Sequence, residues 1–256
     1  MYLDSVKGMA EAACKKAEFL ERSKLSYLIS AALAGAYIGL GIILIFSIGS
    51  PLLADDSPLL KLLMGASFGI ALTLVVFAGA ELFTGNNMVM TLGGLRKSVS
   101  WTEVLKVWCF SWIGNLLGAL VLAYLVVNSG AVRGAADFIE KVAGAKMSLP
   151  AVELFLRAIL CNWLVCLALW SASRTKNDAA KCILIFWCLL AFIASGFEHS
   201  IANMTLLGMS LFAPHAAPIS WSGFTYNMVW VTSGNLVGGA GFVGGLYWLA
   251  TYREEC

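Results

Sequence analysis

The chain has 256 residues, of which 60% are hydrophobic and only 12% are charged. A soluble domain of this length could not bury so much apolar surface, and the mean hydropathy of +0.83 points to an integral membrane protein. The formal net charge of +2 is too small to indicate nucleic acid or another strongly charged partner. The sequence therefore predicts one compact membrane domain over residues 1–256.

The first 24 residues carry nine charged side chains and no uninterrupted apolar run, which is unlike a signal peptide. Apolar residues recur among them at helical spacing: Val6, Met9, Ala13, Ala17 and Leu20. This pattern predicts an amphipathic helix that lies along the cytoplasmic surface of the membrane.

Six apolar stretches follow, and a membrane-spanning helix needs about 20 largely apolar residues. The stretches are 25–53, 62–92, 104–127, 151–172, 182–209 and 228–251. We expect an all-α protein with six spans, in which residues 25–127 and 151–251 form two three-span copies.

Lysine and arginine predict the orientation of these spans. Twelve of them fall on the side of the N-terminus, the 2–3 loop, the 4–5 loop and the C-terminus, where Arg253 lies, and five fall on the other side. Both termini are therefore expected to face the cytoplasm, with the protein in the inner or plasma membrane.

A short motif occurs in both the third and the sixth stretch. Gly-Asn-Leu-x-Gly appears at residues 114–118 and again at 234–238. Glycines four residues apart allow membrane helices to approach closely, and an asparagine in hydrocarbon needs a hydrogen-bond partner. The matched Asn115 and Asn235 therefore favour two related copies of one unit.

The second and fifth stretches also correspond. Each has an apolar run, a glutamate (Glu81, Glu198), then a hydroxyl or an imidazole (Thr84, His199), and then one or two asparagines: Asn86, Asn87 and Asn203. Because each copy has an odd number of spans, the copies should be inverted across the membrane, with a broken helix in each.

A lipid-facing glutamate would be costly, so Glu81 and Glu198 should face the protein interior. A carboxylate beside a break can accept hydrogen bonds from backbone N–H groups that have lost their partners. The freed helix N-termini would then point inward with their positive dipole ends, which favours an anion.

The sequence resembles the formate/nitrite transporter family along nearly its whole length. The matching motifs are "ELFTGNN", "AGAKMSLP", "RAILCNWLVCLA", "GFEHSIANM" and "GNLVGG". The resemblance is strongest to the hydrosulfide-channel branch. It implies a pentamer with an aquaporin-like inverted repeat, in which each protomer has its own pore for a small monovalent anion such as hydrosulfide, formate or nitrite, without a cofactor.

The resemblance also implies roles for individual residues. His199 is the central histidine, Thr84 faces it from the other broken helix, Asn162 supports the site, and Lys146 attracts anions from outside. Four apolar residues are expected to narrow the pore: Leu82, Phe192, Phe68 and Leu72. Phe192 precedes His199 by seven residues, so a continuous helix would place both on nearly the same face.

Two mechanisms fit these residues. His199 donates a proton, so that a neutral acid crosses the apolar ring, or it stays neutral as a hydrogen-bond donor while the anion crosses as a charge. A gate is expected where Lys16 on the N-terminal helix meets residues 82–87, because Gly85 tolerates positive φ. If His199 donates a proton, protons cross the membrane together with the anion.

An alternative interpretation is that the protein is an enzyme. The sequence "GASFG" fits G-x-S-x-G, so Ser67 with His199 could form an intramembrane serine protease, but the motif arises easily in a glycine-rich helix. The two histidines lack neighbours at ligand spacing, so no metal is expected. The seven cysteines, mostly within apolar stretches, are expected to be packed thiols.

Overall fold

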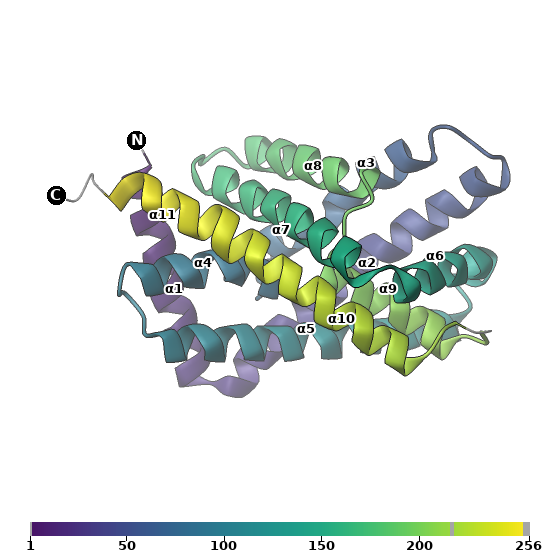
Figure 1. The fold of residues 1–256 in the computed structure, drawn as a ribbon, viewed down its shortest axis with the longest axis horizontal. Helices are drawn as coiled ribbons and strands as arrows, with labels where there is room; N and C mark the ends of the chain where they lie inside the picture. The colour runs from purple at the N-terminus through teal and green to yellow at the C-terminus, as the bar shows by residue number, and fades with distance from the viewer. Residues whose placement is uncertain (1, 216–217, 253–256) are drawn as a thin grey trace.

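A computed structural model describes residues 2–215 and 218–252, which form an elongated helical bundle (Figure 1). Arg253, which was counted in the predicted orientation, and Cys256, one of the seven cysteines, lie outside the described residues. In chain order the elements are α1 (Leu3–Arg22), α2 (Lys24–Ala54), α3 (Leu60–Leu74), the π-helix η1 (Val75–Gly79), α4 (Phe83–Leu95), α5 (Trp101–Ser129), the 3-10 turn η2 (Arg133–Ala135), α6 (Ala136–Ser148), α7 (Ala151–Ser173), α8 (Asp178–Ala194), α9 (Ser200–Phe212), α10 (Trp221–Leu236), the π-helix η3 (Val237–Gly245) and α11 (Leu246–Thr251).

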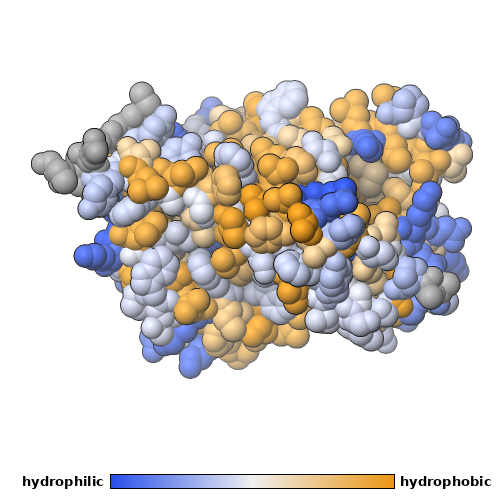
Figure 2. Space-filling model, in the orientation of Figure 1, coloured by the Kyte–Doolittle hydropathy of each residue, from blue (hydrophilic) through white to orange (hydrophobic). Residues whose placement is uncertain are grey.

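Within the described residues, four helical segments are long and apolar enough to cross a membrane: Lys24–Ala54, Leu60–Gly79, Trp101–Ser129 and Ala151–Ser173. The fifth predicted stretch is divided into α8 and α9, whereas α10, η3 and α11 form one continuous rod (Figure 1). Apolar side chains cover much of the face in Figure 2, and hydrophilic ones gather mainly towards its two ends. The protein is a multi-pass membrane protein, and the count of six spans stays a prediction.

The N-terminal helix α1 forms where the apolar spacing predicts it, and its apolar face packs against the rest of the protein. Val6 and Ala13 are fully buried in the protein, and α1 packs on α4. Gly93 of α4 leaves room for Ala13, since a Cβ at this glycine would collide with that side chain. The apolar face of α1 therefore lies against the bundle, and the place of this helix at the cytoplasmic surface stays a prediction.

Helix α6 was not predicted. It lies in the connection between the third and fourth stretches and packs against α9 and α10. Its buried residues Ile139, Ala143 and Met147 recur every four residues, which is the spacing of one helix face. This helix is too short, and its other face too charged, for the apolar pattern to stand out as a membrane-spanning helix does.

Both helix breaks have the same backbone geometry. The break between η1 and α4 contains Gly79 at φ 79°, and the break between α8 and α9 contains Gly196 at φ 69°. The next residues, Ala80 and Phe197, each donate their N–H to a carbonyl five residues back. Glycine adopts positive φ without steric cost, so these two residues allow the chain to leave the helix.

The conformational freedom expected at Gly85 is therefore misplaced. Gly85 lies inside α4, which begins at Phe83, and the non-helical backbone lies at residues 80–82. A Cβ at Gly85 would instead meet the side chain of Leu169, so this glycine permits close packing.

Asn115 of α5 holds the first break. Its Oδ1 accepts a hydrogen bond from Phe83 N at 2.9 Å, and its Nδ2 donates to Ala31 O at 2.7 Å and Glu81 O at 2.9 Å. One fully buried amide thus satisfies the first N–H of α4 and a carbonyl of the break.

Asn235 of α10 makes the same set of bonds at the second break. Its Oδ1 accepts from Ser200 N at 2.8 Å, and its Nδ2 donates to Ala158 O and Glu198 O, both at 2.9 Å. The matched asparagines of the sequence motif therefore hold equivalent positions in two sets of contacts.

The glycines of the same motif bring helices together. A Cβ at Gly118 would collide with the Ala32 carbonyl of α2, and a Cβ at Gly238 would collide with the Ile159 carbonyl of α7. Close approach of these helix pairs lets each asparagine reach across to the neighbouring backbone.

We expect Gly196→Ala to lower the stability of the protein, because a side chain at positive φ costs about 1–2 kcal/mol. No atom lies within 4 Å of the Cβ position, so the variant measures backbone strain without any steric clash of the new methyl group. Thermal unfolding in detergent, followed by tryptophan fluorescence, measures the effect. Gly8→Ala is the control, since Gly8 lies in helix α1 with equally open surroundings; equal midpoints for the two variants would contradict this account.

We also expect Asn235→Ala to cost more than about 2 kcal/mol, because it leaves Ser200 N and two carbonyls without their partner. Asn128→Ala is the matched control. Asn128 is exposed and donates to Tyr124 O, so its loss should cost less than about 0.5 kcal/mol. The unfolding midpoints of both variants check the difference, and similar losses would show that the break does not depend on the asparagine.

Candidate functional site

Thr84 and His199 meet where the two breaks face each other. Thr84 Oγ1 lies 3.1 Å from His199 Nε2, and the two side chains are 0% and 3% exposed. Thr84 is the second residue of α4, and His199 is the residue immediately before α9. The two half-helices therefore place their N-termini at one buried point.

These two residues are not equivalent within the repeated contacts. Asn115 binds the N–H of Phe83 and Asn235 binds that of Ser200, so the residues before them, Leu82 and His199, correspond. The sequence-based pairing of Thr84 with His199 as repeat equivalents is therefore wrong, although the structure brings the two together.

The hydrogen bonds of His199 fix its tautomer. Nδ1 accepts the N–H of Ala202 at 3.1 Å, so it cannot also carry a proton. In the neutral ring the proton must be on Nε2, which donates to Thr84 Oγ1. The imidazole thus caps α9 with one nitrogen and presents an N–H donor with the other.

The N-terminus of α4 is capped differently. Leu82 precedes it and makes no side-chain hydrogen bond to the helix. Two helix N-termini, with their positive dipole ends, converge near Thr84 and His199, and this arrangement favours an anion over a cation.

Apolar side chains close the space around His199. The cavity there has a volume of about 10 Å³, which is room for about one water molecule. It is lined by the four apolar residues named from the sequence, Leu82, Phe192, Phe68 and Leu72, and by Ile38, Val165, Leu189 and His199. That this cavity is the narrow part of a pore stays a prediction. Ile38, Val165 and Leu189 were not among the residues expected there, because an apolar residue within an apolar helix gives no sign of which side it faces.

Aromatic rings form much of this constriction. The ring centroids of Phe68 and Phe192 lie 5.5 Å apart, and those of Phe192 and His199 lie 6.0 Å apart with nearly parallel planes. The chain leaves the helix between Phe192 and His199, so the expectation of a shared face on a continuous helix is wrong. The non-helical segment between α8 and α9, rather than helical periodicity, brings these rings together.

Asn162 of α7 supports the site from behind. Its Nδ2 lies within hydrogen-bonding distance of Thr84 O at 3.2 Å, Asn87 Oδ1 at 3.1 Å and Asn235 O at 2.6 Å. These contacts bring α4, α7 and α10 together at Asn162, which lies against the backbone of Thr84; its role in supporting the site stays a prediction.

The two glutamates have partners other than the helix ends. Glu81 pairs with Lys16 of α1 at 2.7 Å, and Glu198 pairs with Lys146 of α6 at 2.6 Å. The expectation that these carboxylates accept the freed backbone N–H groups is wrong, because asparagines take that role. Glu198 and His199, neighbours in sequence, thus serve separate interactions.

Each glutamate also accepts a side-chain amide five residues later. Asn86 Nδ2 donates to Glu81 at 3.1 Å, and Asn203 Nδ2 donates to Glu198 at 2.6 Å. The sequence indicated these asparagines as supports of the breaks, but it gave no sign of Tyr27, whose hydroxyl donates to Glu81 at 3.0 Å.

The geometry does not support a serine protease. Ser67 Oγ donates to Leu63 O at 2.8 Å, within its own helix. Both ring nitrogens of His199 bond elsewhere, to Ala202 and Thr84. A nucleophile needs a base within hydrogen-bonding reach, and the described bonds join this serine to none.

In residues 2–215 and 218–252 no group of three histidine, cysteine or carboxylate side chains is placed to hold a metal ion. The six cysteines in this part of the chain are free thiols. Cys109 is exposed, so packing does not explain all of them.

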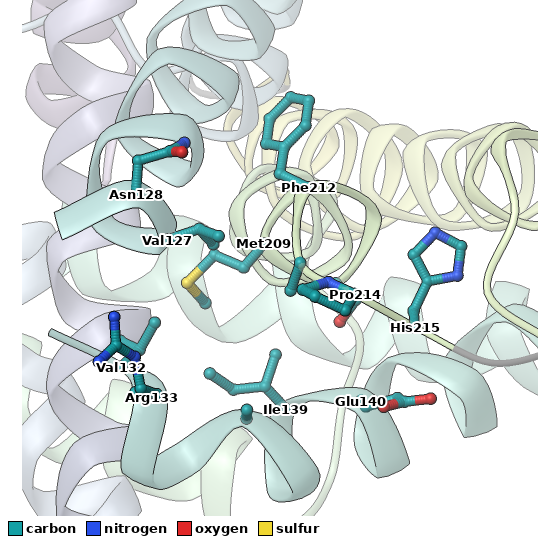
Figure 3. Close-up of a pocket in the computed structure, with 13 residues that line it drawn as sticks. Val127, Asn128, Val132, Arg133, Ile139, Glu140, Met209, Phe212, Pro214 and His215 are labelled. Carbon is teal, nitrogen blue, oxygen red and sulfur yellow. The ribbon is translucent and has the colours of Figure 1, made fainter. Parts of the chain in front are cut away.

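A separate cavity of about 430 Å³ lies between the ends of α5 and α9 and the start of α6. Figure 3 shows Glu140 and His215 on one side of this cavity and Arg133 on the other. Neither Thr84 nor His199 lines it, so it is distinct from the buried site.

Comparison with known proteins agrees with this geometry. Residues 4–249 match the sequence profile described as Formate/nitrite transporter. The nitrite transporter NirC of Escherichia coli is 47% identical over 257 aligned residues, covering 100% of this chain and 94% of that protein.

Two solved structures are similar over most of their length. One, described as an FNT family ion channel, has a TM-score of 0.92 and 44% identity, covering 97% of this chain and 99% of that chain. A pentameric formate channel with formate bound has a TM-score of 0.80 and 28% identity, covering 91% and 99%. These relatives are transporters and channels, in agreement with a protein that is not an enzyme. The chain belongs to the formate/nitrite transporter family.

Proposed function

We propose that the protein is a membrane channel for small monovalent anions, with its selective point at Thr84 and His199. The observation that carries this proposal is the meeting of two half-helix N-termini at a buried donor pair, inside an apolar constriction. An anion loses its hydration there at great cost. The two dipole ends and the hydrogen-bond donors offset part of that cost.

Nitrite and formate are the first candidate substrates. The Escherichia coli relative is described as a nitrite transporter, and one of the similar structures is a pentameric formate channel with formate bound. Both are planar, singly charged anions with oxygen acceptors that suit an N–H donor. Hydrosulfide, expected from the sequence motifs, stays a prediction as a third substrate.

His199 acts in this proposal as a neutral hydrogen-bond donor. Its Nε2–H leaves Thr84 and donates to the passing anion while Nδ1 continues to cap α9. A charged imidazolium would need a proton on Nδ1 and would release the N–H of Ala202. The geometry thus favours passage of the anion over transfer of a proton from His199.

We also propose the larger arrangement that the sequence predicts: two inverted three-span copies, a pentamer, and both termini in the cytoplasm. The duplicated bonds of Asn115 and Asn235 support the repeat, and the similar pentameric channel supports the assembly.

The cytoplasmic gate is proposed at α1 and segment 82–87. The pair between Lys16 and Glu81 lies one residue from Leu82, which lines the constriction. Because α4 begins at Phe83, movement must come from residues 79–82 rather than from the helical part.

The direct test is anion entry into liposomes that contain only the purified protein. Nitrite and formate should enter faster than in protein-free liposomes, and chloride should enter far more slowly, because it is a poorer match to directed N–H donors. Stopped-flow recording with an anion-sensitive dye measures these rates. Equal rates with and without protein, for all three anions, would remove the proposed function.

His199→Asn separates the two mechanisms. Asparagine is a good helix cap and an amide donor, but it does not titrate. We expect the variant to keep the parent's dependence of nitrite flux on external pH, with a lower rate at every pH. His199→Leu is the matched control and should lose most of the flux; a pH dependence that flattens in His199→Asn would instead identify the histidine as a proton donor.

A further inference from the structure

The cavity between the ends of α5 and α9 and the start of α6 carries opposite charges on its two sides. Arg133 lies on one side, and Glu140 and His215 lie on the other (Figure 3). Apolar side chains, among them Ile139 and Met209, lie between them. This lining suits a molecule with an anionic group at one end and a cationic hydrogen-bond donor at the other.

The turn that follows α5 positions Arg133. Gly130 ends this helix at φ 75°, and a Cβ there would lie 3.0 Å from Arg133 Nη2. Ser50 Oγ of α2 donates to Gly134 O at 2.8 Å, which ties the turn to the bundle. Within the described part of the chain, the Arg133 guanidinium takes part in no hydrogen bond or ion pair. Its five N–H donors are therefore available to an anion such as a phosphate group.

An apolar groove leads along α5 to this cavity. The groove has a volume of about 320 Å³ and lies between α2 and α5. Val121 and Leu125 line it and are each 59% exposed, and Asn128 lines the cavity. These three residues recur at i, i+4 and i+7, so they share one face of the helix. The groove and the cavity are two parts of one surface.

The length of this surface fits a lipid chain. Leu117 lines the groove and Asn128 lines the cavity, and an α-helix rises about 16 Å between these positions. Half of the hydrocarbon core of a bilayer is about 15 Å thick. One acyl chain of a single leaflet therefore spans the groove.

Aromatic side chains place the cavity at the level of lipid headgroups. Phe212 lines the cavity and contacts the rings of Tyr124 and Trp221 at centroid distances of 5.9 Å and 6.3 Å. Tyr124 and Trp221 are both exposed. Exposed tyrosine and tryptophan are typical of the boundary between membrane and water.

We propose that this surface binds a phospholipid whose headgroup carries a phosphate and a primary ammonium, as in phosphatidylethanolamine. The phosphate binds Arg133, the ammonium binds Glu140, and one acyl chain lies in the groove between α2 and α5. A carboxylate accepts several hydrogen bonds at once, and an ammonium donates three. In the proposed orientation this lipid belongs to the outer leaflet.

Aromatic side chains fill the corresponding place at the end that carries α1. In the proposed repeat, α1, α4 and α11 correspond to α6, α9 and the end of α5. Tyr2, just before α1, packs against Tyr247 of α11 with ring centroids 5.4 Å apart, and the Arg174 guanidinium lies 5.3 Å from the centre of the Tyr2 ring. The repeat itself therefore does not require an open cavity here.

The test measures lipid retention by native mass spectrometry. The purified protein in mild detergent is mixed with equal amounts of phosphatidylethanolamine, phosphatidylcholine and phosphatidylglycerol. We expect the parent to retain about one phosphatidylethanolamine per protomer and about fivefold less of either other lipid. Choline has no N–H to donate to Glu140, and the glycerol headgroup has no cation for it.

Variants of the two charged residues separate their roles. Arg133→Gln should lower retention of phosphatidylethanolamine about tenfold, because the charged donor to the phosphate is lost, and Arg133→Lys should restore most of it. Glu140→Gln should retain the three lipids about equally. Lys141→Gln is the control, since Lys141 is exposed on the same helix and does not line the cavity. An unchanged oligomer size shows that each variant folds.

Three outcomes would overturn the inference. Equal retention by the parent and by Arg133→Gln would show that the lipid binds elsewhere. Failure of the parent to retain phosphatidylethanolamine would leave the groove to contact with a second copy of the chain. Equally tight binding of glycerophosphoethanolamine, which lacks acyl chains, would make the cavity a site for a soluble zwitterion. Anion entry is not measured here, so none of these results depends on the proposed function.

Discussion

A backbone that leaves the helix inside a membrane must find its hydrogen bonds within the protein, because lipid offers none. Two helices are interrupted here, at Gly79 and at Gly196. Asn115 and Asn235 each make the same set of three hydrogen bonds to backbone groups at and beside their break. The close packing of α5 on α2 and of α10 on α7, which glycines permit, puts these amides within reach.

The geometry of the candidate site depends on these hydrogen bonds. Once each asparagine satisfies its break, the two half-helices direct their N-termini at each other, and Thr84 and His199 meet between them. The glutamates are then free to hold lysines rather than backbone groups. Two helix N-termini, an imidazole and an apolar ring surround one buried point, and a lysine is held on a carboxylate beside each break.

Much of this could be predicted from the sequence, because local patterns determined it. The apolar stretches and the spacing of Val6, Met9 and Ala13 predicted the long helices and α1. The repeated Gly-Asn-Leu-x-Gly motif predicted close helices and partnered amides. The breaks were placed near the right glutamates, yet the glycine two residues before each was overlooked, although Gly-x-Glu occurs at both.

Other features have no local signal. Lys16 and Glu81 are 65 residues apart, and Lys146 and Glu198 are 52 apart, so only the fold brings them together. The tautomer of His199 depends on a backbone N–H that becomes available because α9 starts there. Residues such as Ile38 and Val165 line the constriction through helix packing alone.

The proposed passage of an anion depends on a neutral His199 that holds its proton on Nε2, because Nδ1 caps α9. Nitrogen-15 solid-state NMR of the protein in lipid bilayers measures this directly, and His215→Gln removes the other histidine signal. The account predicts one protonated ring nitrogen, assigned to Nε2, and one unprotonated nitrogen, assigned to Nδ1, at neutral pH. Two protonated nitrogens, or a proton on Nδ1, would contradict it.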